Sequence, residues 1–117
     1  MTIEWHYENR PGAGLLSLSG FLGDQAGARF TGAVGWALSR GQGPLVVDLT
    51  GLQGWSQRGR DSLVVAAQRF AEEGRSLELA GVPADNAAFT QGAGDPDIRC
   101  HRDLPAALAA HSGPAGQ

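Results

Sequence analysis

The segment at residues 44–63, PLVVDLTGLQGWSQRGRDSL, constrains the fold of this chain more than any other segment. Residues 45–49 are apolar almost throughout, which is typical of a central parallel strand that is covered on both faces. Residues 50–58 are glycine-rich and are predicted to be a loop, and residues 59–73 then repeat apolar side chains at helical spacing. Because strands that alternate with helices build α/β folds, we expect a parallel sheet with helices packed on it.

Further strands and helices alternate along the rest of the chain. Ile3, Trp5 and Tyr7 alternate with polar residues, which predicts an edge strand with one buried face. Asp24 is predicted to cap the first helix, and Gly41 is predicted to end it. The expected strands are residues 3–7, 15–19, 45–49, 77–80 and 98–101. The expected helices are residues 25–40, 59–73 and 83–91 and a last helix capped by Asp103.

The order of these elements, ββαβαβαβα, predicts a single α/β domain over residues 1–111. The short turn at residues 10–14 indicates that the first two strands form an antiparallel hairpin. Helices separate the later strands, so right-handed crossovers should make the rest of the sheet mostly parallel. Residues 112–117, SGPAGQ, are small and polar, and we expect them to form a disordered tail.

The charge and composition of the chain argue against several classes of protein. A net charge of −3 without a basic cluster argues against binding to nucleic acid through phosphate neutralisation. No apolar run approaches the roughly 18 residues that span a membrane. The first residues lack the basic and apolar regions of a secretory signal. A single cysteine, Cys100, fits a reducing compartment, so we expect a cytoplasmic protein.

The sequence offers little catalytic chemistry. It has no phosphate-binding loop of the GxxxxGK[ST] type, and its glycines do not form a dinucleotide fingerprint. Cys100 and His101 are neighbours on an expected strand and point to opposite faces, so they do not converge simply on one metal or substrate. His6 and His111 lack the spacing of zinc ligands. We therefore expect a protein that is not an enzyme and that has no catalytic residues, no metal and no cofactor.

The strand, loop and helix at residues 44–63 resemble the core of the STAS domain of bacterial anti-sigma factor antagonists. In that family a buried strand ends in Asp-Leu-Ser, and an Asp-Ser-x-Gly-Leu motif then opens a helix. Here Asp48 begins the Asp-Leu-Thr that matches the strand end, and Gly59 falls on the family glycine without a gap. Ser56 then takes the position of the family aspartate, and Gln57 takes that of the phosphorylated serine. The likeness extends over about residues 3–111 and implies the STAS fold.

The resemblance implies a regulatory binding protein. In the family, the unphosphorylated domain binds an anti-sigma factor and thereby frees a sigma factor. The anti-sigma factor is often an ATP-dependent serine kinase, and its phosphorylation of the domain separates the pair. Gln57 has no hydroxyl group and cannot accept a phosphoryl group, so we expect the usual switch to be absent. Ser56 is either a helix cap or a shifted phosphoacceptor.

By analogy with the family, the partner-binding surface should join residues 20–24, residues 53–59 and the first turns of the next helix. The residues expected on it are Asp24, Ser56, Gln57, Arg58, Gly59, Arg60 and Asp61. Cations at a helix N-terminus are mildly unfavourable to the helix dipole. Arg58 and Arg60 therefore either contact an acidic partner or are ordinary solvated side chains, and Asp61 offsets them.

Two other functions fit the same fold. The chain is alternatively a scaffold or sensory STAS module within a larger signalling assembly, and the absence of a phosphoacceptor at Gln57 favours this alternative. It is alternatively a domain that binds a small ligand such as a nucleotide or a lipid. The oligomeric state is open between monomer and dimer.

Overall fold

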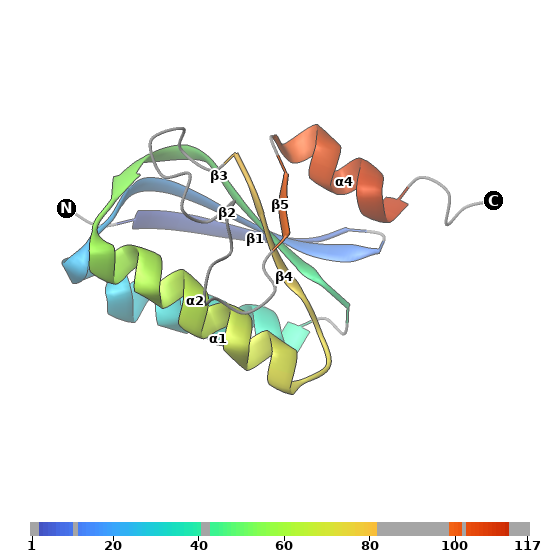
Figure 1. Cartoon of the computed structure of the whole chain (residues 1–117), viewed down its shortest axis with the longest axis horizontal. Helices are drawn as coiled ribbons and strands as arrows, with labels where there is room; N and C mark the ends of the chain where they lie inside the picture. Colours follow the sequence, from blue (N-terminus) through green and yellow to red (C-terminus); the bar gives the residue numbers. More distant parts are fainter. Residues whose placement is uncertain (1–2, 11, 41–42, 82–98, 102, 113–117) are drawn as a thin grey trace.

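The centre of the fold is a mixed sheet with the strand order β1-β2-β3-β4-β5 (Figure 1). The computed structural model describes residues 3–10, 12–40, 43–81, 99–101 and 103–112. The strands are β1 (Ile3–Arg10), β2 (Ala13–Leu22), β3 (Leu45–Trp55), β4 (Leu77–Ala80) and β5 (Arg99–His101). The helices are α1 (Gly27–Arg40), α2 (Gln57–Glu72) and α4 (Leu104–Ser112), and a short 3₁₀ helix, η1 (Asp24–Ala26), precedes α1.

The pairing of the strands combines one antiparallel edge with a parallel remainder. β1 and β2 form the expected antiparallel hairpin, in which Ile3 pairs with Gly20. The other neighbours run parallel: Leu45 of β3 pairs with Gly14 of β2 and with Leu77 of β4. β5 is parallel to β4. The predicted α/β fold, with a hairpin added to a parallel sheet, is therefore confirmed.

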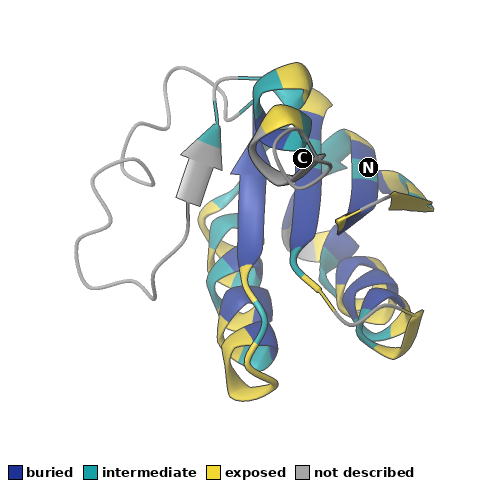
Figure 2. Cartoon of the chain, turned by 90° about the vertical axis from the view of Figure 1, so that its right-hand side faces the viewer, coloured by how far each residue is buried: buried dark blue, intermediate teal, exposed yellow. Residues whose placement is uncertain are grey.

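Helices cover both faces of the sheet. α1 and α2 lie on one face, and α4 covers part of the other (Figure 1). Figure 2 shows α1 and α2 with their buried sides toward the sheet and their exposed sides toward solvent. Phe30 and Phe70 are among the largest side chains of the core beneath α1 and α2. A smaller core includes Val46, Ala80 and Ala107 and joins α4 to the sheet.

β3 is longer than the sequence predicts. Residues 50–55 were expected in a loop, but they continue the strand and pair with the end of β2. Gly51 lies opposite Ser19, and a Cβ built on Gly51 would come within 3.1 Å of the Leu18 carbonyl oxygen. The two backbones approach closely here, which suits glycine. Pairing with the neighbouring strand β2 therefore outweighs the loop preference of this glycine-rich segment.

The starts of two helices also differ from the prediction. Asp24 is wrong as the cap of the first helix, because Gly23 occupies the N-cap position and Asp24 is the first residue of η1. The chain after β2 tightens into this 3₁₀ turn before α1 begins, as is common at helix N-termini. α2 begins at Gln57, before the predicted start at Gly59, because Ser56 caps it.

The last helix has the cap that the sequence predicts. The Ala106 amide N–H donates a hydrogen bond of 2.9 Å to Oδ1 of Asp103, directly before α4. α4 ends at Ser112, the first residue of the expected tail. The helix expected at residues 83–91 and the tail at residues 113–117 lie outside the described residues.

Candidate functional site

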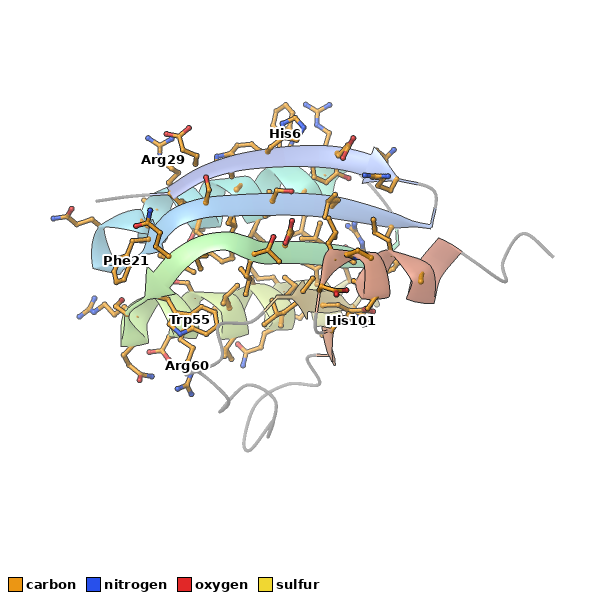
Figure 3. All side chains as sticks on the ribbon, turned by 90° about the horizontal axis from the view of Figure 1, so that it is seen from above. His6, Phe21, Arg29, Trp55, Arg60 and His101 are labelled. Atoms are coloured by element: carbon orange, nitrogen blue, oxygen red, sulfur yellow. The ribbon has the colours of Figure 1, made fainter. Side chains whose placement is uncertain are left out.

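The candidate site lies where β2 and β3 end and α2 begins. Leu22, the last residue of β2, pairs with Trp55, the last residue of β3, so both strands end at the same edge of the sheet. In Figure 3, Phe21, Trp55 and Arg60 lie toward this end of the molecule. The carboxyl ends of parallel strands are where open α/β sheets place their binding sites. The topology therefore puts the start of α2 at the edge best suited to recognition.

Ser56 fixes the start of α2. Its backbone is extended, with φ −93° and ψ 174°, and its Oγ accepts a hydrogen bond of 3.1 Å from the Gly59 amide N–H. The Ser56 amide N–H donates to the Leu22 carbonyl oxygen at 3.0 Å, which ties the helix start to the end of β2. The interpretation of Ser56 as the helix cap is therefore confirmed. As a shifted phosphoacceptor it stays a prediction.

Gly59 is required by the close approach of α2 to β2. Gly59 is buried, and a Cβ built on it would overlap the Leu22 carbonyl oxygen and lie 2.9 Å from the carbonyl carbon. The tip of a side chain can move aside, but the backbone of a paired strand cannot do so cheaply. Glycine is the residue that allows this approach. The glycine of the motif thus seats the first turn of α2 directly on β2.

Gln57 is the first residue of α2, and its side chain is exposed. Its Nε2 donates a hydrogen bond of 3.1 Å to Oδ1 of Asp61, which is also exposed. The amide N–H groups in the first turn of a helix lack intrahelical partners and favour a nearby anion. The position of Gln57 is thus open to solvent and electrostatically suited to a phosphate, while its own side chain supplies no acceptor hydroxyl.

Two arginines place positive charge beside the helix start. Arg58 is exposed and Arg60 is partly buried. Among the described residues, Arg58 has no ion-pair partner. The helix dipole opposes a cation at this end by a few tenths of a kcal/mol up to about 1 kcal/mol. The charge of Arg58 is therefore available to an acidic group on a partner.

Asp24 belongs to the neighbouring element η1, which lies against α2 and the end of β2. The structure therefore brings the expected partner-binding residues to one end of the molecule: residues 56–61 follow one another from the cap into α2, and the backbone of Asp24 lies on the element beside them. Their role in binding stays a prediction.

A groove that the sequence did not reveal lies next to these residues, between α1 and α2. Its volume is about 380 Å³, and Arg58, Asp61 and Ser62 are part of its lining. Val65 also lines it and is 54% exposed. The signal in the sequence is weak, because Val65 directly precedes Ala66 of the buried stripe and an apolar residue beside such a stripe is unremarkable.

Comparison with models of known protein families identifies the family of this chain. The family model described as "Mlab, STAS domain" matches residues 5–94. This chain belongs to the STAS domain family. The matched range contains most of β1, all of β2 to β4, and α1 and α2, and so includes the whole start of α2. No curated protein sequence is significantly similar to this STAS domain.

Solved structures share the fold of this STAS domain. An anti-sigma factor antagonist from Mycobacterium paratuberculosis matches with a TM-score of 0.75 at 18% identity, over 93% of each chain. The anti-sigma factor antagonist SpoIIAA in its unphosphorylated form matches with a TM-score of 0.70 at 10% identity, over 92% of this chain and 96% of that one. The murine anion transporter Slc26a9 matches 74% of this chain with a TM-score of 0.62 at 14% identity, over 14% of its own length. The fold therefore occurs both in small proteins and within a larger one.

The two histidines whose side chains the structure describes do not lie at the site. His6 and His101 lie on different strands, away from the start of α2 (Figure 3), and His101 Nε2 lies 2.7 Å from Oε1 of Glu78. In the part of the chain that the structure describes, no group of three or more metal-ligating side chains is placed to hold a metal ion. In the same part, no helix is both long enough and apolar enough to cross a membrane.

Proposed function

We propose that this STAS domain is a cytoplasmic, non-enzymatic regulatory protein of the anti-sigma factor antagonist type. It binds an anti-sigma factor and thereby frees a sigma factor for transcription. The observation that carries this proposal is the geometry at the start of α2, where the Ser56 cap and the contact of Gly59 with Leu22 hold residues 56–61 at the sheet edge. The likeness of the fold to solved antagonists supports the class of partner.

We place the contact surface on Asp24 and residues 56–61. Gln57, Arg58 and Asp61 are exposed there and offer an amide, a cation and a carboxylate to a partner. Arg60 and the capping Ser56 are partly buried, and Ser56 stabilises the helix start through its hydrogen bond to Gly59. Apart from Asp24, the proposed surface is formed by consecutive residues, and hydrogen bonding and close packing against Leu22 of β2 hold their backbone in place.

Gln57→Ser is expected to create a phosphoacceptor that the wild-type chain lacks at this position. A serine hydroxyl here would be exposed beside the amide groups of the first turn of α2, which stabilise an anion. A phosphate of about −1.5 to −2 charges would then disrupt the desolvated interface. With labelled ATP and purified kinase-type anti-sigma factors of the same organism, we expect about one phosphate per Gln57→Ser chain and none on the wild type.

Gln57→Ala is the matched control, because it removes the same amide without adding a hydroxyl. It should remain unphosphorylated, and its affinity for the partner measures the effect of losing the amide alone. Stoichiometric phosphate mapped to Ser56 of the wild-type chain would identify a shifted acceptor and would contradict the absence of a switch.

Arg58→Glu is expected to weaken binding to the anti-sigma factor about tenfold or more, equal to about 1.4 kcal/mol. Arg58 is exposed and free of ion pairs within the described residues, so reversing its charge replaces attraction to an acidic partner group by repulsion. Arg10→Glu is the control, since Arg10 lies at the hairpin end of β1 and pairs with Glu8 at 3.4 Å. Isothermal titration calorimetry measures the affinity of both variants for the anti-sigma factor. Equal affinities would show that Arg58 does not belong to the interface.

A scaffold or sensory module is the second candidate function. It is favoured by the glutamine at position 57 and by the occurrence of the fold within the murine transporter. Light scattering after size-exclusion chromatography separates the two functions. A stable complex with a purified anti-sigma factor supports the antagonist function. A homo-oligomer that binds none of the anti-sigma factors tested supports the scaffold function.

A further inference from the structure

The groove between α1 and α2 has an apolar floor and an open mouth. Its lining includes Phe30, Val34 and Ala66, which are buried side chains of the two helices. Val65 lies on the same lining with 54% of its surface exposed. Among the described residues, Val65 and Trp36 are the large hydrophobic side chains that stay exposed. The groove's volume of about 380 Å³ is that of a small-molecule pocket, so it can receive apolar side chains of a larger ligand.

Two arginines stand toward opposite ends of this groove. Arg58 lies in the first turn of α2 and Arg69 in the last, which separates their Cα atoms by roughly 16 Å at 1.5 Å per residue. Arg69 extends toward α1, because a Cβ built on Gly35 would lie 3.7 Å from its Nη2. Neither arginine has an ion-pair partner within the described residues. The carboxylate on the lining, Asp61, already accepts a hydrogen bond from Gln57.

We propose that the groove binds an amphipathic helix of the partner protein, with its apolar stripe on the floor and two acidic residues on Arg58 and Arg69. The inference rests on the proposed function, because Arg58 and Asp61 belong both to the groove and to the proposed contact surface. A helix in a groove is anchored by apolar residues at i, i+3 or i+4, and i+7 spacing. Two carboxylates three turns apart on such a helix are separated by about 16 Å, which matches the two arginines. Guanidinium groups bind carboxylates in a bidentate geometry, so the pairs also set the register of the helix.

One glycine of α1 allows the groove to be filled without disturbing the fold, and a second provides a control outside the groove. Gly27 lines the groove and has helical dihedral angles, and a Cβ built on it would meet no atom within 4 Å. Gly32 has equally open space at its Cβ position, but it is exposed and is not part of the lining. Gly27→Leu and Gly32→Leu therefore add the same side chain to the same helix, and the first alone enters the groove.

The test measures fluorescence anisotropy with a labelled helical peptide of about 18 residues. The peptide carries a leucine stripe at helical spacing and two glutamates three turns apart, and a second peptide has lysines in place of the glutamates. We expect the glutamate peptide to bind wild type and Gly32→Leu equally, Gly27→Leu at least tenfold more weakly, and the lysine peptide to bind wild type at least tenfold more weakly. Thermal unfolding of both variants confirms that they are folded.

Several outcomes would overturn the inference. Equal binding of the glutamate peptide to Gly27→Leu and wild type would show that the peptide binds outside the groove. Equal binding of the two peptides to wild type would show that Arg58 and Arg69 do not recognise the glutamates. Absence of binding up to the solubility limit would exclude a helix of this chemistry. A wild-type dimer that Gly27→Leu dissociates would identify a second copy of the chain as the occupant.

The same two variants distinguish a failure of this inference from a failure of the proposed function. If a purified anti-sigma factor binds wild type and Gly27→Leu alike, the function stands and the groove is not its site. If no anti-sigma factor binds while the glutamate peptide behaves as expected, the groove is a helix-binding site and the proposed class of partner is wrong.

Discussion

Gly59→Ala is expected to lower the free energy of unfolding by about 2 to 3 kcal/mol. The added methyl group would overlap the carbonyl oxygen of Leu22, and this backbone atom cannot rotate away as a flexible side chain would. The clash outweighs the gain of roughly 1 kcal/mol that alanine brings over glycine in a helix interior. The first turn of α2 must then move away from β2, which also disturbs the cap that Ser56 forms with the Gly59 amide.

The matched control for this prediction is Gly32→Ala in α1. A Cβ at Gly32 meets no atom within 4 Å, so the helix propensity of alanine should stabilise the protein by up to about 1 kcal/mol. Urea unfolding followed by circular dichroism measures both variants, and the two changes should have opposite signs. A Gly59→Ala variant as stable as Gly32→Ala would show that α2 does not rest on the β2 backbone.

The same contact should matter for binding. Residues 56–61 are presented by a backbone that is anchored through Leu22, which accepts the hydrogen bond of the Ser56 amide and contacts Gly59. A Gly59→Ala chain that still folds should therefore bind the anti-sigma factor more weakly than the wild type. Comparison with Gly32→Ala at equal folded concentration separates this effect from lost stability.

The parts of the fold that the sequence predicted correctly are those that depend on local patterns. The helical spacing of Leu63, Ala66, Ala67 and Phe70 identified the buried stripe of α2, because one face of a surface helix must be apolar to pack. The polar and apolar alternation of β1 and the short turn after it predicted the hairpin. The cap formed by Ser56 is also local, since its hydroxyl bonds an amide three residues ahead.

The parts that the sequence missed depend on contacts between distant segments. Gly51 and Gly54 suggested a loop, but pairing with β2 draws them into β3. The need for Gly59 comes from Leu22, which is far away in the sequence. The groove next to the candidate site is formed jointly by side chains of α1 and α2, and Gly27 leaves open space on its α1 side. No single segment contains that information.

His101→Ala is expected to lower the free energy of unfolding by about 2 to 3 kcal/mol. Glu78 on β4 is the charged side chain that is buried among the described residues, with 3% of its surface exposed. Its Oε1 lies 2.7 Å from Nε2 of His101 on β5, and its Oε2 accepts a weaker hydrogen bond of 3.3 Å from the Ser76 hydroxyl. Without the imidazole, the buried carboxylate keeps its desolvation penalty and loses its contact with His101. Since β5 is a short strand, this pair also fixes it to β4.

A double-mutant cycle gives the sharpest test of this pair. Removal of both partners in Glu78→Leu with His101→Ala should cost less than the sum of the two single changes, because the buried carboxylate is then removed together with the imidazole that binds it. His6→Ala is the control, since His6 is exposed on β1 and should change stability by less than about 0.5 kcal/mol. A coupling energy near zero, or an effect of His101→Ala no larger than that of His6→Ala, would mean that the contact between Glu78 and His101 does not stabilise the β4–β5 edge.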